Sequence, residues 1–159
     1  MPDQTVVVET SKGLVRMVLD VEGAPVTAGN FLDLARQGFY DGLRFHRYVA
    51  GFVIQGGDPA GNGSGGSGRT IKLETTSRYK HDSAGTVAMA RTSQPDSASS
   101  QFYITLAPAP FLDRENAQDG LGYAAFGKVS EGLDVVEQLR EGDRIERITV
   151  SEAGASEGA

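Results

Sequence analysis

The chain has 159 residues, the size of a single domain, and 39% of them are hydrophobic, which is enough for a core of its own. It contains no cysteine and only two histidines, which excludes disulfide scaffolds, zinc–thiolate sites, thiol nucleophiles and three-histidine metal sites. The formal net charge of −6 argues against nucleic acid as a partner, and the lack of a leader pattern or a long apolar run predicts a cytoplasmic protein without membrane contact.

The first forty residues predict a hairpin followed by a helix. Residues 4–20 hold two β-branched, apolar stretches joined by a Ser-Lys-Gly turn, which is the pattern of a β-hairpin. In residues 25–38 apolar side chains recur at helical spacing, Pro25 suits the first turn, and Gly38 suits the end. The apolar face of this helix holds Ala28, Phe31, Leu32 and Ala35.

The middle of the chain predicts short strands around a glycine-rich loop. Residues 44–58 carry two short apolar stretches, and residues 56–68 are so rich in glycine that they predict a loop. A polar loop is also expected at residues 113–122. Further strands are expected at 70–74, 85–91, 100–107 and 123–129.

The last thirty residues predict a second helix and a closing strand. Ser130 can cap a helix over residues 130–141, and residues 144–150 alternate like a strand. The apolar face of the helix holds Leu133, Val136 and Leu139. The polar tail at 151–159 should be flexible.

These elements favour a mainly β fold. Helices do not alternate regularly with the strands, which argues against a parallel sheet with helices on both faces. We expect a closed antiparallel barrel of about eight strands, capped by two α-helices. Residues 1–150 should form this single domain.

The glycine-rich loop is compatible with nucleotide binding. Residues 61–66 match the spacing G-x-G-x-x-G, and residues 63–70 match a phosphate-binding loop except that Arg69 replaces lysine. Both motifs need a helix N-terminus directed at the phosphate. The segment after the loop is instead strand-like, which disfavours a nucleotide site.

A serine hydrolase is a further alternative. Its candidate residues are Ser99 or Ser100, His46, and Asp58 or Asp96. The G-x-S-x-G turn that presents such a nucleophile is absent, and isolated Ser, His and Asp residues occur in any chain.

Two parts of the chain carry the most specific pattern. Residues 45–58, FHRYVAGFVIQGGD, place the Arg47 guanidinium and the Gln55 amide among apolar groups. Residues 87–92 read VAMART, and residues 99–104 read SSQFYI. With these blocks the chain resembles the cyclophilin-type peptidyl-prolyl cis-trans isomerases of the compact bacterial kind. The family blocks F-H-R, G-F-x-x-Q-G-G-D, a glycine-rich loop, M-A-R/N, S-Q-F-F/Y-I, F/W-L-D and F-G-K-V occur here in that order.

The resemblance implies an isomerase that accelerates rotation about X–Pro bonds in proline-containing polypeptide clients and so assists protein folding, without a cofactor or metal. It assigns catalysis to Arg47, Phe52 and Gln55. The substrate-binding positions that it implies are Val53, Ala90, Arg91, Gln101, Tyr103, Phe111, Leu112 and Tyr123. A monomer is expected, because no large exposed apolar segment demands a partner. A module that only holds proline-containing loops is the alternative, against which the three catalytic residues argue.

Four of these positions depart from residues that are common in the family. Val53 stands where many members have Met, and Tyr103 where many have Phe. Phe111 and Tyr123 stand where eukaryotic members often have Trp and His. These departures bear on inhibitor affinity more than on catalysis, so the resemblance implies weak binding of cyclosporin.

Overall fold

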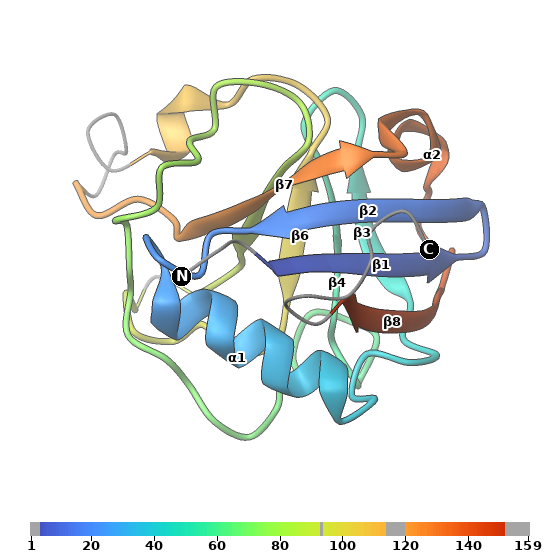
Figure 1. Ribbon diagram of the computed structural model, residues 1–159, viewed down its shortest axis with the longest axis horizontal. Coiled ribbons are helices and arrows are strands. Elements are labelled where there is room, and N and C mark those ends of the chain that lie inside the picture. The colour runs from blue at the N-terminus through green and yellow to red at the C-terminus, as the bar shows by residue number, and fades with distance from the viewer. Residues whose placement is uncertain (1–3, 93, 114–119, 152–159) are drawn as a thin grey trace.

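The structure is a computed structural model that describes residues 4–92, 94–113 and 120–151, and these form one eight-stranded sheet with two α-helices (Figure 1). The strands are β1 Gln4–Thr10, β2 Gly13–Leu19, β3 Phe45–Val49, β4 Val53–Gly56, β5 Thr86–Met89, β6 Phe102–Thr105, β7 Ala125–Glu131 and β8 Ile145–Ser151. The helices are α1 Pro25–Arg36, α2 Leu133–Gln138 and the short 3₁₀-helix η1 Pro110–Leu112.

Helix α1 confirms the first predicted helix and packs against β7 and β8. Pro25 lies in its first turn, where a missing N–H costs nothing. The N–H groups of Val26 and Thr27 donate to the Glu74 carboxylate at 3.2 and 2.8 Å, so a distant side chain replaces the usual N-cap. The helix ends before Gly38, whose φ of +75° suits glycine.

All neighbouring strands of the sheet are antiparallel, in the order β3-β4-β6-β5-β7-β2-β1-β8. The predicted hairpin is confirmed, since β1 and β2 pair from Thr10 and Gly13 outward. The sheet curls into a half-barrel, with β3 and β8 as its edges.

A closed barrel was expected, and the structure does not show one. The two edges meet at an isolated bridge between Arg44 and Arg144, beside which Phe45 donates to the Asp143 carbonyl at 2.7 Å. Continued past this bridge, antiparallel pairing would set β3 opposite residues 139–143 and β8 opposite residues 37–43. Those residues form the turns after α2 and α1, so the edges find no strand to pair with.

Several other expectations need correction. Ser130 does not cap α2, because β7 continues through it to pair with β2 and its Oγ donates to the Arg16 carbonyl at 3.3 Å. Helix α2 starts later, after Gly132, whose φ of +94° turns the chain. The strand expected at 70–74 is only an isolated bridge between Ile71 and Ala98.

The expected flexible tail lies outside the described residues, except for Ser151, which still belongs to β8. Most of the polar loop expected at 113–122 also lies outside them. Of that loop, the structure describes Asp113, directly after η1, and residues 120–122, before β7.

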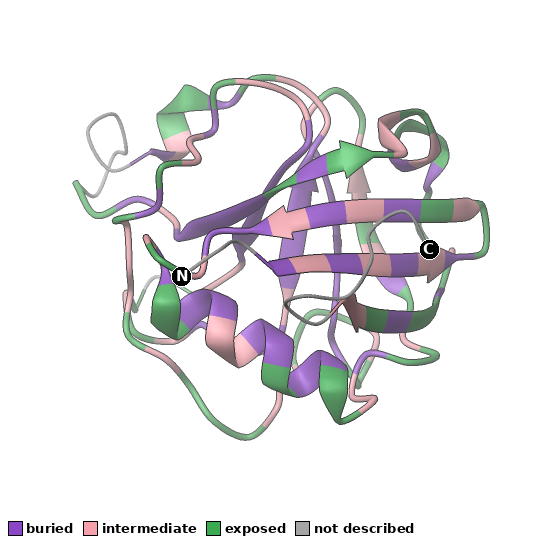
Figure 2. Cartoon of the chain, viewed as in Figure 1, coloured by how far each residue is buried: buried purple, intermediate pink, exposed green. Residues whose placement is uncertain are grey.

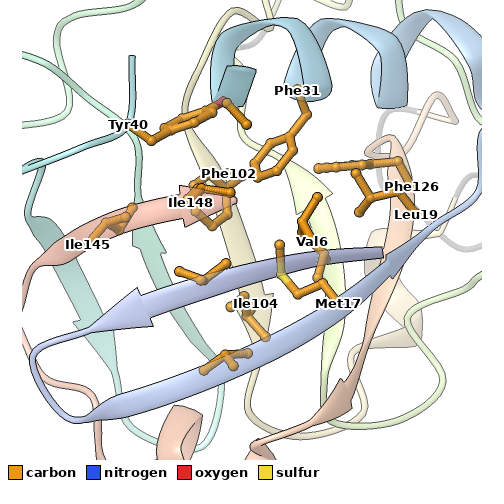
Figure 3. Packing of buried hydrophobic residues seen from close by; sticks show 14 of the residues in the cluster. Val6, Met17, Leu19, Phe31, Tyr40, Phe102, Ile104, Phe126, Ile145 and Ile148 are labelled. Atoms are coloured by element: carbon orange, nitrogen blue, oxygen red, sulfur yellow. The ribbon is translucent and has the colours of Figure 1, made fainter. Parts of the chain in front are cut away.

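The main core fills the concave side of the half-barrel beneath α1 (Figure 3). The Phe31 ring lies 4.9 Å from Tyr40, 5.3 Å from Phe102 and 5.4 Å from Phe126, measured between ring centroids. Strand β1 buries every second residue, as Figure 2 shows. Strands β4, β5 and β6 are instead buried on both faces, so something also covers their outer face.

Candidate active site

A second apolar cluster covers the outer face of β4, β5 and β6. Its buried members are Val53, Ala88, Tyr103 and Ala125. Side chains alternate along strands, so these residues face away from the main core to which their neighbours Ile54 and Ile104 belong. Ala88 on β5 pairs with Tyr103 on β6 and with Ala125 on β7, so residues of three neighbouring strands lie side by side there.

Val53 and Tyr103 of this cluster form the floor of a pocket of about 220 Å³. The pocket is lined by Arg47, Phe52, Val53, Gln55, Ala90, Arg91, Tyr103, Leu112 and Tyr123. The structure therefore gathers nine of the eleven residues that the family resemblance implied. Gln101 and Phe111 are the other two, and both lie beside the pocket. Phe111 is 55% exposed and stacks on Phe52 at 5.7 Å between ring centroids.

The polar side of the pocket is a chain of hydrogen bonds that starts at Arg47. Its Nη1 donates to Gln55 Oε1 at 3.0 Å, and Gln55 Nε2 donates to Gln101 Oε1 at 3.1 Å. Gln101 Nε2 donates in turn to the carbonyls of Gly63 and Gly65, at 2.9 and 2.8 Å. The glycine-rich loop therefore anchors Gln101, Gln101 orients Gln55, and Gln55 holds the exposed guanidinium at the pocket mouth.

Asp58 shapes the glycine-rich loop from within. Its buried carboxylate accepts the backbone N–H groups of Ala60, Asn62 and Gly63, at 2.8, 3.0 and 2.5 Å. Burial by itself would raise the Asp58 pKa, but these N–H groups hold the pKa below its usual value. They face the protein's own carboxylate, and no helix follows the loop, which contradicts the nucleotide-binding alternative.

We expect Asp58→Asn to destabilise the fold by about 1–3 kcal/mol at neutral pH, because an amide cannot accept all of these N–H groups. A lowered carboxyl pKa stabilises the fold above the unfolded pKa, and the effect is lost as pH falls through the folded pKa. The stability difference between wild type and variant should therefore shrink below about pH 4. Urea unfolding at pH 7 and at acidic pH measures it, with the exposed Asp82→Asn as the control. A difference that does not depend on pH would contradict this role.

The hydrolase alternative finds no support in the geometry. Ser100 Oγ is buried and donates to the Gly57 carbonyl at 2.6 Å, while Ser99 Oγ bonds to Ser67. Among the described residues, His46 Nδ1 has no hydrogen-bond partner. The hydroxyls of Ser99 and Ser100 thus bond to Ser67 and Gly57, and no bond from either to His46 is found in the described part of the chain.

Arg91 secures the far rim of the pocket. Its guanidinium lies 4.5 Å from the centroid of the Tyr123 ring, and its Nη2 donates to the Gly122 carbonyl at 2.6 Å. Tyr123 meets Tyr103 edge-on, with 6.2 Å between centroids. These contacts lock one wall of the pocket in place.

The sequence did not reveal the residues directly behind the pocket. His81 Nε2 lies 2.8 Å from Tyr103 Oη, and its Nδ1 lies 2.7 Å from Asp113 Oδ1. Tyr103 gave one indication that a polar group lies behind the pocket, because a buried tyrosine usually finds a hydrogen-bond partner for its hydroxyl. Nothing in the sequence indicated which residue that partner would be.

Comparisons with known proteins identify the family to which the chain belongs. The family described as "Cyclophilin type peptidyl-prolyl cis-trans isomerase/CLD" matches residues 5–154. A peptidyl-prolyl cis-trans isomerase of Helicobacter pylori is 39% identical over 146 residues, which are 91% of this chain and 85% of that protein. Peptidyl-prolyl cis-trans isomerase B of Bacillus subtilis is 43% identical over 129 residues, covering 81% of this chain and 85% of the relative. The chain belongs to the cyclophilin-type peptidyl-prolyl cis-trans isomerase family.

The solved structures lead to the same family. A cyclophilin of Cryptosporidium parvum superposes with a TM-score of 0.84 at 30% identity, over 94% of this chain and 98% of that one. The predicted activity is thereby confirmed: this cyclophilin is a peptidyl-prolyl cis-trans isomerase. In the part of the chain that the structure describes, no helix has the length and apolar character needed to cross a membrane.

Proposed function

We propose that Arg47, Phe52 and Gln55 carry the isomerase reaction at the pocket of about 220 Å³, with the proline ring seated on its apolar floor. The observation that carries the proposal is the bond from Arg47 to Gln55 at the mouth of an apolar pocket. One Cryptosporidium parvum cyclophilin was crystallised in the presence of the dipeptide Ala-Pro, which supports a proline-containing substrate.

The reaction needs a site that favours a twisted amide. Amide resonance opposes rotation with a barrier of about 18–20 kcal/mol. The upper value corresponds to a rate on the order of 10⁻² s⁻¹. At the twist the carbonyl loses its resonance partner and the nitrogen regains its lone pair. No covalent bond breaks and no net proton moves, so the site needs no acid–base pair.

Arg47 suits this charge redistribution. A guanidinium is charged at every relevant pH and presents five N–H donors in a planar fork. Only Nη1 of Arg47 is engaged within the described ranges, by Gln55, which leaves donors for the substrate. A fixed donor of this kind stabilises such a transition state by about 3–4 kcal/mol once the bound substrate displaces water from the pocket mouth.

The apolar floor keeps the proline ring still while the acyl part turns. Val53 and Tyr103 are buried there, and Phe52 and Leu112 form walls. Burying a ring of that size contributes about 1.5–3 kcal/mol. Gln55 and Gln101 can hydrogen-bond the substrate backbone without reading its side chains, so we infer that the clients are diverse proline-containing polypeptides. An isomerisation assay on a short Ala-Pro peptide tests the activity.

We expect kcat/KM to vary less than twofold between about pH 6.5 and 8.5, because arginine stays charged throughout. Burial lowers the pKa of both histidines, and the neighbouring carboxylates Asp58 (for His46) and Asp113 (for His81) offset it only in part. Both imidazoles therefore lose their proton at a lower pH than a free histidine does. Steady-state assays across the range, with His46→Gln as a control, check the expectation. A bell-shaped profile that His46→Gln abolishes would reveal a proton transfer.

A further inference from the structure

Three buried polar side chains form a chain behind the proline pocket. His81 is 0% exposed, Tyr103 5% and Asp113 7%. The imidazole joins the other two, with Nε2 at 2.8 Å from Tyr103 Oη and Nδ1 at 2.7 Å from Asp113 Oδ1. The His81 and Tyr103 rings also stack, with 5.8 Å between centroids. The proposed roles of Arg47 and Gln55 make no use of this chain.

The direction of the hydrogen bonds follows from the chemistry of the groups. A carboxylate only accepts, so His81 Nδ1 carries the proton that it donates to Asp113. Burial, the largest influence, lowers the His81 pKa although Asp113 acts to raise it, which favours the neutral ring, and in that ring Nε2 accepts from the Tyr103 hydroxyl. The Tyr103 hydroxyl therefore forms its hydrogen bond with His81, and Tyr103 also lines the pocket.

The same histidine also clamps the pocket rim. Helix η1 carries Phe111 and Leu112, and Asp113 follows it directly. On one side of η1 the Ala109 N–H donates to the His81 carbonyl at 2.9 Å. On the other side the Asp113 carboxylate accepts the His81 backbone N–H, at 3.1 and 3.2 Å for its two oxygens. Both ends of the short helix are therefore bound to one residue.

We propose that His81 is a positioning residue for the isomerase reaction, which sets the Tyr103 floor and the η1 rim of the proline pocket at a fixed distance from each other. This inference rests on the proposed function, in which Tyr103 and Leu112 wall the pocket. His81 touches no substrate and acts through these two walls.

The kinetic signature of such a role is a change in KM. The pocket grips the proline ring in the ground state and in the twisted state alike, so a displaced wall weakens both to the same extent. Uniform binding of this kind changes KM and leaves kcat nearly constant. If His81 only stabilised the fold, its substitution would lower the melting temperature and leave both KM and kcat unchanged in the folded enzyme.

A double-mutant cycle tests the proposal by breaking one hydrogen bond from each side. Tyr103→Phe removes the hydroxyl and keeps the ring. His81→Asn keeps a donor for Asp113 and loses the atom that reaches Tyr103, so the buried carboxylate stays paired. We expect each single variant to raise KM about three- to tenfold with kcat within twofold, and the double variant to raise it no further than the larger single effect.

Each result of these kinetic measurements either supports or overturns the proposed role of His81. Unchanged KM in Tyr103→Phe, multiplicative effects in the double variant, or a loss of kcat at constant KM would each overturn the proposal. Should His81→Asn fail to fold, Tyr103→Phe alone decides it through KM. His46→Gln, at the other histidine, should leave KM within twofold. Arg47→Ala in the same assay tests the proposed catalytic role separately, so a failure of that role is distinguishable from a failure of His81 positioning.

Discussion

Arg47→Ala should lower kcat/KM for a short proline-containing peptide by about 10²–10³-fold, because it removes a donor that acts mainly in the transition state. The fold should tolerate the change, since the Arg47 side chain is exposed and its described hydrogen bond goes to Gln55 alone. The loss should therefore appear in catalysis and leave the free energy of unfolding within about 0.5 kcal/mol of the wild-type value.

Two further variants serve as comparisons for Arg47→Ala. Arg47→Lys keeps the charge without the planar fork, so we expect it to recover only a minor part of the lost activity. Arg36→Ala removes an arginine from α1, which covers the main core, and should retain wild-type kcat/KM. Wild-type turnover in Arg47→Ala would refute the proposed mechanism and leave the family assignment intact.

Cyclosporin should bind the wild-type protein about ten- to a hundredfold more weakly than a member with Trp at the position of Phe111, and Phe111→Trp should recover part of that affinity. Phe111 stands where eukaryotic members often present an indole N–H, and a phenyl ring has no donor. A ligand acceptor buried against it loses its partner at a cost of about 1–3 kcal/mol, which corresponds to that range of affinities.

The geometry suits this substitution. Phe111 is 55% exposed and stacks on Phe52, so an indole can take its place without repacking the core. The shift in the inhibition constant should exceed any shift in kcat/KM. Leu121→Trp, which adds an indole at another exposed position, serves as the control. Equal potency toward wild type and Phe111→Trp would show that Phe111 does not occupy the proposed rim position.

Local patterns in the sequence were enough to predict much of this protein. Two β-branched, apolar stretches joined by a Ser-Lys-Gly turn predicted the β1–β2 hairpin, and helical spacing between Pro25 and Gly38 predicted α1. The motif resemblance singled out eleven site residues, nine of which the structure brings to one pocket and two of which lie beside it. These features depend on neighbours a few positions apart, or on blocks whose order along the chain is specific.

The tertiary structure alone decided the edges of the sheet and the start of α2. The register between β2 and β7 draws Ser130 into a strand, although its residue type suits a helix cap. The barrel stays open because the bridge from Arg44 to Arg144 sets turns, rather than strands, opposite the two edges. Pairing register is a property of two segments together, so neither segment predicts it by itself.

The hydrogen-bonded side chains of His81, Tyr103 and Asp113 behind the pocket are the clearest example of a feature that only the tertiary structure decided. His81 lies 22 positions from Tyr103 and 32 from Asp113 along the chain. Helical and strand periodicities relate residues two to four positions apart, so no pattern along the sequence couples these three. The fold brings them together in a buried space where each polar group must find a partner, and the partner is whichever polar side chain the folded chain places there.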